Sequence, residues 1–204
     1  MHRAVNAANV ITVMRILLIP VVVAVLFAKI PHGDALAAAL FTVAALTDKL
    51  DGYVARRQNK ITSLGQFLDP LADKLLIAAA LIALVSLERL AAWVAMVIIA
   101  REIAVSVLRI VGAAQGISMP ADRLGKAKTA SQVIAVLFLM APHQRLPHYV
   151  MIETVLIWIA VILTLVSGLN YFAKSRDILR LTGAGAKPAP GDTRADSTTE
   201  PDDA

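Results

Sequence analysis

Two pairs of aspartates lie where two apolar segments adjoin, and they are the side chains of this sequence best suited to chemistry. Asp48 and Asp51 stand near the end of one segment, and Asp69 and Asp73 stand near the start of the next. Residues three or four positions apart share one face of a helix, so each pair would present two carboxylates side by side. Charged groups in or beside a membrane segment are costly and are usually functional.

Four neighbouring carboxylates repel one another unless something neutralises their charge, and the residue types leave three explanations open. Protons could neutralise them, as in a proton pathway, or divalent cations could lie between them. Oxygen ligands without His or Cys suit Mg²⁺, Mn²⁺ or Ca²⁺ rather than Zn²⁺. Structural salt bridges could instead come from the nearby basic residues, which are Lys49, Arg56, Arg57 and Lys74.

Two small residues on the acidic helix face favour a bound ligand. Gly52 and Ala55 fall on or beside the face that carries Asp48 and Asp51. A ligand that approaches a helix backbone needs such clearance, whereas a row of salt bridges does not. Close packing of membrane helices on small residues is the alternative explanation.

The composition excludes an ordinary soluble domain as the setting of these residues. Of the 204 residues, 58% are hydrophobic and 17% are charged. Soluble domains are nearer half apolar and a quarter charged. The chain has no cysteine, which excludes disulfides, thiolate metal sites and cysteine nucleophiles.

Six apolar segments are long enough to cross a bilayer, which takes about 20 residues. They cover residues 10–28, 35–56, 67–87, 90–112, 127–142 and 149–172. They lack the alternation of barrel strands, so we expect an all-α membrane domain of six transmembrane helices over residues 1–182. The polar, Gly- and Pro-containing residues 183–204 predict a disordered acidic tail.

The basic residues predict the orientation in the membrane. The formal net charge is +5, and cytoplasmic loops of membrane proteins carry excess Lys and Arg, so we expect no nucleic-acid partner. One side of the predicted bundle holds most of the basic residues, whereas the other holds only Lys29, Arg89 and Arg145. We therefore expect both termini and the four aspartates to face the cytoplasm from the inner (cytoplasmic) membrane of the cell.

The acidic residues belong to a longer pattern of eight identities at fixed spacing, Asp48-x2-Asp51-Gly52-x2-Ala55-Arg56-x8-Gly65-x3-Asp69-x3-Asp73. This pattern resembles, without a departure, the signature of the CDP-alcohol phosphatidyltransferases. That family transfers a phosphatidyl or similar group from a CDP-linked donor to an alcohol. The resemblance implies the family's fold of six transmembrane helices, which is usually dimeric, so we expect a homodimer in the lipid bilayer.

The resemblance also implies roles for individual residues. Asp48, Asp51, Asp69 and Asp73 would bind Mg²⁺ or Mn²⁺, as two ions, and Asp73 would also be the catalytic general base on the acceptor hydroxyl. The CDP-diacylglycerol site would comprise Gly52, Ala55 and Arg56, with Thr62, Thr12 and Arg15 as weaker candidates. Thr62 could instead cap a helix, and Arg15 could instead extend to the lipid headgroups.

Further matches are similar to the branch of the family that makes phosphatidylglycerophosphate in bacteria. They comprise residues 9–15, residues 100–103 with Ser106 and Arg109, and residues 125–129 with Gln132, with one departure at Ile110 where an acidic residue is expected. The implied reaction joins CDP-diacylglycerol to sn-glycerol 3-phosphate and releases CMP. Alternatives are a cardiolipin synthase or a phosphatidylinositol phosphate synthase of the same fold and, more remotely, a cation or proton transporter.

A glycerol 3-phosphate acceptor is a dianion, so its pocket must be cationic. The candidates are Arg101, Arg109, Lys126 and Lys128, of which the two lysines could instead be ordinary cytoplasmic-side charges. Glu102 follows Arg101 directly and is expected to point elsewhere on the helix. The aromatic residues Trp93, Trp158 and Tyr171 are expected to be interface anchors or packing residues, and the histidines 143 and 148 are not expected to be ligands.

Overall fold

The computed structural model of the chain describes residues 7–28, 30–58, 63–114, 123–141 and 147–175. Within these ranges it describes all side chains except those of residues 7–11, 48–58, 63–70, 123, 147 and 174. The tail predicted over residues 183–204 therefore lies outside the described residues, as does Thr62.

The described residues form six helices and no strand, which confirms the predicted all-α class. The helices are α1 (Ala7–Phe27), α2 (Gly33–Gln58), α3 (Ser63–Ser86), α4 (Ala92–Ala114), α5 (Arg123–Met140) and α6 (Pro147–Lys174). Each helix overlaps one predicted apolar segment. The largest differences are at the starts of α3 and α5, which begin four residues early because Lys, Arg and Gln are good helix formers although they are not apolar.

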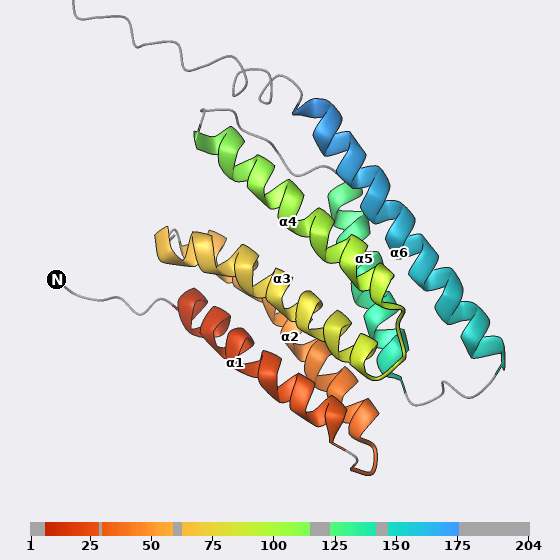
Figure 1. Cartoon of the computed structure of the whole chain (residues 1–204). Coiled ribbons are helices and arrows are strands. Elements are labelled where there is room, and N and C mark those ends of the chain that lie inside the picture. Colours follow the sequence, from red (N-terminus) through yellow and green to blue (C-terminus); the bar gives the residue numbers. More distant parts are fainter. Residues whose placement is uncertain (1–6, 29, 59–62, 115–122, 142–146, 176–204) are drawn as a thin grey trace, which may run out of the picture.

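The chain reverses at each connection, so that the helices run alternately up and down the bundle (Figure 1). Helix α1 packs on α2 and α3, and α3 also packs on α4 and α5. Helix α5 contacts α2 and α6, and α6 contacts α4. Figure 1 shows α1 and α6 at opposite edges of the bundle, with α3 and α5 between them.

The interior is apolar at one end of the bundle and polar at the other. The apolar core gathers side chains near the α1–α2, α3–α4 and α5–α6 connections, such as Leu26, Leu84 and Met140. The buried polar side chains lie instead near the start of α1, the start of α5 and the end of α6, and comprise Thr12, Arg15, Lys128, Gln132, Thr164, Ser167 and Ser175. This polar end is also the end at which α2 finishes and α3 begins, where the four aspartates stand.

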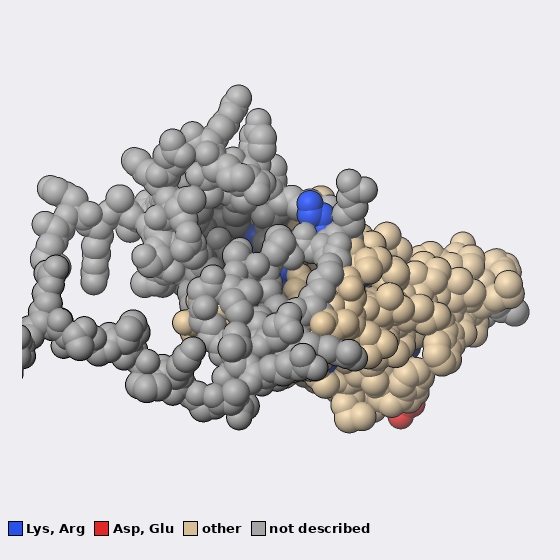
Figure 2. Space-filling model, turned by 90° about the horizontal axis from the view of Figure 1, so that it is seen from above, with Lys and Arg blue, Asp and Glu red and all other residues tan. Residues whose placement is uncertain are grey.

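The outer surface is strongly apolar. Large side chains such as Met96, Met151 and Leu169 are about two-thirds exposed, at 66%, 71% and 69%. On the face seen in Figure 2 the described surface is almost entirely uncharged, with a few Lys and Arg atoms showing and one acidic group at its edge. Charged groups inside and bare apolar side chains outside reverse the distribution found in soluble proteins.

One helix of the described part of the chain, His148–Ala173, is long and apolar enough to cross a membrane by length and composition. Two shorter apolar stretches cover Thr12–Phe27 and Gly33–Thr47. The helices by themselves therefore support one membrane span, and the predicted number of six spans stays a prediction.

An ion pair fastens the apolar end of the bundle. Arg89, in the α3–α4 turn, donates from one nitrogen to both carboxylate oxygens of Asp34 at the start of α2, at 3.0 and 2.9 Å. The two turns that carry this pair contain His32 and Glu88, each with a positive φ, of 59° and 58°. The pair holds the two turns together at the end farthest from the aspartates.

Candidate active site at the polar end of the bundle

The four aspartates stand on two adjacent antiparallel helices at one end of the bundle. Asp48 and Asp51 lie on α2, and Asp69 and Asp73 lie on α3, all within unbroken helix, so the predicted helical spacing within each pair is confirmed. Helices α2 and α3 pack against each other and are joined by residues 59–62 alone. The side chains of Asp48, Asp51, Asp69, Gly52, Ala55 and Arg56 lie outside the described ones, so their predicted roles stay predictions.

Asp73 is the one of the four whose side chain is described, and it is partly buried. Its carboxylate lies within electrostatic range of Lys128 on α5. The next residue, Lys74, donates a 2.5 Å hydrogen bond to the hydroxyl of Ser106 on α4. Lys74 is therefore held by α4, and its possible salt bridges to the other aspartates involve side chains outside the described ones.

Glu102 is the centre of an ionic cluster within the bundle. Its carboxylate accepts a hydrogen bond from Arg101 at 3.3 Å and pairs with Lys128. The expectation that Glu102 points away from Arg101 is therefore wrong, because the long arginine side chain reaches the carboxylate of its neighbour. The side chains of Arg101, Glu102 and Lys128 are only 10%, 17% and 6% exposed.

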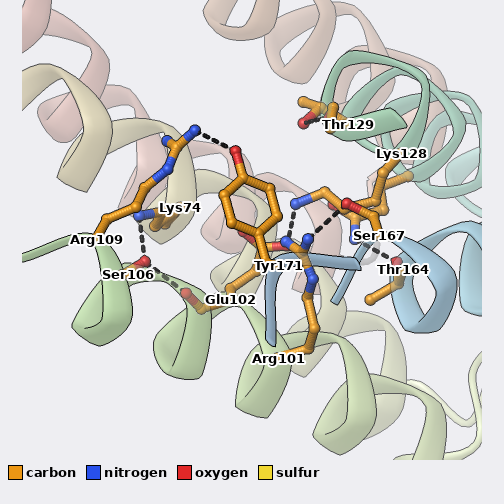
Figure 3. Close-up of polar contacts among 12 residues, drawn as sticks. Lys74, Arg101, Glu102, Ser106, Arg109, Lys128, Thr129, Thr164, Ser167 and Tyr171 are labelled. Atoms are coloured by element: carbon orange, nitrogen blue, oxygen red, sulfur yellow. Dashed lines mark hydrogen bonds and ion pairs between the residues drawn. The ribbon is translucent and has the colours of Figure 1, made fainter. Parts of the chain in front are cut away.

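Helix α6 completes the cluster through two hydroxyl groups (Figure 3). Arg101 donates to the Ser167 hydroxyl at 2.6 Å, and Arg109 donates to the Tyr171 hydroxyl at 2.6 Å. The Tyr171 ring lies between the two guanidinium groups, whose central carbons are 5.9 and 5.2 Å from the ring centre. Tyr171 is buried, at 6% exposure, and so is not the interface anchor that was one of its two predicted roles.

The structure separates the four cations predicted for the acceptor pocket into two sets. Arg101, Arg109 and Lys128 come together on α4 and α5, and Lys128 lies within electrostatic range of Asp73. Lys126 is exposed and takes no part in this cluster, as expected for an ordinary surface charge. Below the cluster, Gln132 donates to Thr164 at 2.9 Å and links α5 to α6.

Thr12 and Arg15, the donor-site candidates on α1, are both buried, at 0% and 1% exposure. Arg15 donates from Nε to the carbonyl oxygen of Ala44 on α2 at 3.3 Å. Ala44 lies one turn before Asp48, so Arg15 is directed into the bundle beside the acidic end of α2. Its alternative role, reaching out to the lipid headgroups, is wrong.

Sequence reasoning missed the contribution of α6. Thr164, Ser167, Tyr171 and Ser175 are all buried and follow one another at intervals of three or four residues. That interval places hydroxyl groups along one face of a helix. The spacing of these hydroxyl residues can be read from the sequence, but the apolar residues between them make the segment look like an ordinary membrane helix. The tryptophans expected at the interface, Trp93 and Trp158, are half exposed and pack together with ring centres 5.8 Å apart.

Comparison with known proteins identifies the family of this chain. The sequence model of the family described as CDP-alcohol phosphatidyltransferase matches residues 5–166. A Bacillus subtilis protein named CDP-diacylglycerol–glycerol-3-phosphate 3-phosphatidyltransferase is 42% identical, over 86% of this chain and 97% of its own. A Pseudomonas fluorescens protein of the same name is 40% identical over 87% and 94%. A Mycobacterium tuberculosis protein named probable phosphatidylglycerophosphate synthase is 38% identical over 86% and 85%. The chain belongs to the CDP-alcohol phosphatidyltransferase family.

Proposed function

We propose that this protein transfers the phosphatidyl group of CDP-diacylglycerol to sn-glycerol 3-phosphate, forming phosphatidylglycerophosphate and CMP. The observation that carries the proposal is the cationic cluster of Arg101, Arg109 and Lys128, whose lysine lies within electrostatic range of Asp73. The names of relatives that align over most of both chains support the same donor and acceptor.

The charges of the cluster suit a phosphate dianion. Arg101, Arg109 and Lys128 carry three positive charges, and Glu102 carries one negative charge, which leaves a surplus of two. Arg101 and Lys128 are largely buried, whereas Arg109 is at an exposed position beside them. A buried cation without a full counter-charge is costly, so a dianion that binds Arg101 and Lys128 and also reaches Arg109 is favoured. The planar guanidinium groups can each donate two hydrogen bonds to phosphate oxygens, which a lone ammonium cannot.

The reaction requires one bond to form and one to break at the donor phosphorus. A hydroxyl oxygen of the acceptor attacks the phosphorus that bears the diacylglycerol, and the bond from that phosphorus to the CMP oxygen breaks. Asp73, whose chain neighbour Lys74 bonds Ser106 on α4, accepts the proton of the attacking hydroxyl. Arg101, Arg109 and Lys128 hold the acceptor phosphate so that the hydroxyl is directed at the phosphorus.

The donor set fits two Mg²⁺ or Mn²⁺ ions. Asp48, Asp51, Asp69 and Asp73 supply only carboxylate oxygens, on two packed helices at one end of the bundle. When bound, the ions neutralise the pyrophosphate of the donor and stabilise the departing CMP. Gly52, Ala55 and Arg56 on α2, with Thr62, Thr12 and Arg15, would contact CDP-diacylglycerol, and the burial of Arg15 beside Ala44 supports its part.

The apolar outer surface supports insertion of the whole bundle in a bilayer with six spans, and the membership of the family is the reason to expect a homodimer. We place the aspartates and both termini on the cytoplasmic side of the inner membrane, because most Lys and Arg residues at the helix ends and their connections lie at that end, whereas the other end holds only Lys29, Arg89 and Arg145. This orientation lets a lipid donor enter from the bilayer and a soluble acceptor enter from the cytoplasm.

The test is an acceptor panel on the purified protein in detergent. CDP-diacylglycerol and Mg²⁺ or Mn²⁺ are mixed in turn with glycerol 3-phosphate, inositol phosphate, serine and phosphatidylglycerol, and CMP release is followed. We expect release with glycerol 3-phosphate alone. Release with phosphatidylglycerol alone would make the protein a cardiolipin synthase, and release with inositol phosphate alone would also overturn the proposed acceptor.

A further inference from the structure

Helix α6 combines the strongest membrane-crossing character of the described helices with a polar inner face. Its outer face exposes residues such as Trp158, Ile162 and Leu169. Its inner face buries Thr164, Ser167 and Tyr171, each of which bonds a side chain of another helix. Buried hydroxyl groups in an apolar helix are costly unless they are hydrogen bonded. These hydroxyl groups are therefore stabilised by their hydrogen-bond partners, which for Ser167 and Tyr171 are the two arginines of α4.

Ser167 and Gly168 together fix the guanidinium group of Arg101. Ser167 accepts its hydrogen bond at 2.6 Å. A Cβ atom on Gly168 would lie 3.1 Å from Cγ and 3.3 Å from Nε of Arg101. The arginine stem thus lies directly against the bare backbone of α6, and a Cβ at position 168 would require that stem to move by a few tenths of an ångström.

Tyr171 acts on both arginines at once. Its hydroxyl accepts from Arg109, and its ring lies between the Arg101 and Arg109 guanidinium groups. Arg109 is at an exposed position of α4, and its hydrogen bond to the Tyr171 hydroxyl holds its guanidinium group against α6. An aromatic face attracts cations, so the ring favours this placement of two like charges.

We propose that Ser167, Gly168 and Tyr171 of α6 are positioning residues that set the spacing and direction of Arg101 and Arg109 for a phosphate-monoester dianion. This inference rests on the proposed function and extends it to residues that do not themselves touch the acceptor. The acceptor's affinity is then governed by α6, whereas the donor and the metal ions are held by α1, α2 and α3.

The test is a steady-state comparison of Ser167→Ala, Gly168→Ala and Tyr171→Phe with the wild type. Ser167→Ala and Tyr171→Phe should each raise KM for glycerol 3-phosphate roughly tenfold, the usual effect of losing one charge-assisted hydrogen bond. Gly168→Ala should raise the same KM because its Cβ displaces the Arg101 stem. The kcat and the KM for CDP-diacylglycerol should stay within about twofold of wild type, because acceptor binding alone is changed. Inorganic phosphate should become a correspondingly weaker competitive inhibitor against glycerol 3-phosphate.

A matched control is Tyr149→Phe, which makes the same change at the other end of α6, where the ring packs on His148 and Phe138. It should leave every constant unchanged. Size-exclusion chromatography in detergent checks folding, and Ser167→Ala and Tyr171→Phe, which only remove an oxygen atom, keep the test available if Gly168→Ala does not fold.

A double variant separates positioning from general support of the bundle. If Tyr171 acts through Arg109, adding Tyr171→Phe to Arg109→Ala should leave KM for glycerol 3-phosphate at the value of Arg109→Ala alone. Multiplied effects, or an equal rise in KM for both substrates, would overturn the inference. A wild type without glycerol 3-phosphate activity would overturn the proposed function as well, whereas an active wild type with unchanged variants would overturn the α6 inference alone.

Discussion

Glu102 on α4 and Lys128 on α5 form an ion pair inside the polar end of the bundle, and the same carboxylate also accepts a hydrogen bond from Arg101. One carboxylate therefore balances two buried cations. The pair joins two helices that are separated along the chain by residues 115–122. Its removal should affect both the stability of the bundle and its response to an anionic acceptor.

Glu102→Gln should destabilise the protein and strengthen its response to glycerol 3-phosphate. The amide can still hydrogen bond, but Lys128 loses its counter-charge, which costs about 1–3 kcal/mol of unfolding free energy. A dianion in the cluster restores the missing negative charge, so the acceptor should raise the Tm of the variant more than that of the wild type. Thermal unfolding in detergent with and without glycerol 3-phosphate measures both effects.

Asp34→Asn is the matched control for this prediction. It breaks the ion pair with Arg89, whose side chain is 21% exposed, at the opposite end of the bundle. The control should lower the Tm, while the shift produced by glycerol 3-phosphate stays as in the wild type. An acceptor-induced shift in Glu102→Gln no larger than that of the wild type would contradict the dianion role of the cluster.

Asp73→Asn should reduce CMP release by at least about 100-fold, because the amide cannot accept the proton of the attacking hydroxyl. Membrane insertion and binding of CDP-diacylglycerol should be largely intact, since the side chain keeps its size. Turnover assays and donor binding to the purified variant measure the two properties. A variant that fails to insert or aggregates in detergent would show instead that the carboxylate is structural.

The sequence predicts where the helices of this protein lie along the chain better than it predicts which side of each helix is buried. Apolar runs of membrane length locate all six helices, and rigid i, i+3 and i, i+4 spacing locates the aspartate pairs. Which face of a helix turns inward depends on its neighbours. Tyr171 was expected either at an interface or in packing, and only its neighbours in the bundle decide that it is buried, between two arginines.

Long side chains are a second reason for the differences. Helical geometry places the Cα–Cβ bonds of Arg101 and Glu102 in different directions, yet the arginine side chain is long enough to reach back. In the same way, Lys74 lies next to an aspartate in sequence but bonds Ser106 on another helix. Residue types thus indicated the charges of the site, whereas their pairing required the packing of α4, α5 and α6.

Removal of divalent ions should abolish turnover. EDTA should stop CMP release, and excess Mg²⁺ or Mn²⁺ should restore it, because carboxylate oxygens are the ligands these ions prefer. Each of Asp48→Asn, Asp51→Asn and Asp69→Asn should require more metal for half-maximal rate. Turnover that persists after exhaustive chelation would favour salt bridges or protons as the means of neutralising the four carboxylates.

Single cysteines should report the orientation of the bundle, because the natural chain contains none. Ala92 and Ala114 are exposed residues at the two ends of α4, and Ala114 lies at the end that carries the aspartates. In intact cells, a membrane-impermeant maleimide should label Ala92→Cys directly and Ala114→Cys only after the membrane is permeabilised. Both variants should keep wild-type CMP release, which confirms that the labelled protein is folded. Labelling of Ala114→Cys from outside would place the aspartates on the extracytoplasmic side and overturn the proposed topology, and labelling of both positions without permeabilisation would show that α4 does not span a sealed membrane.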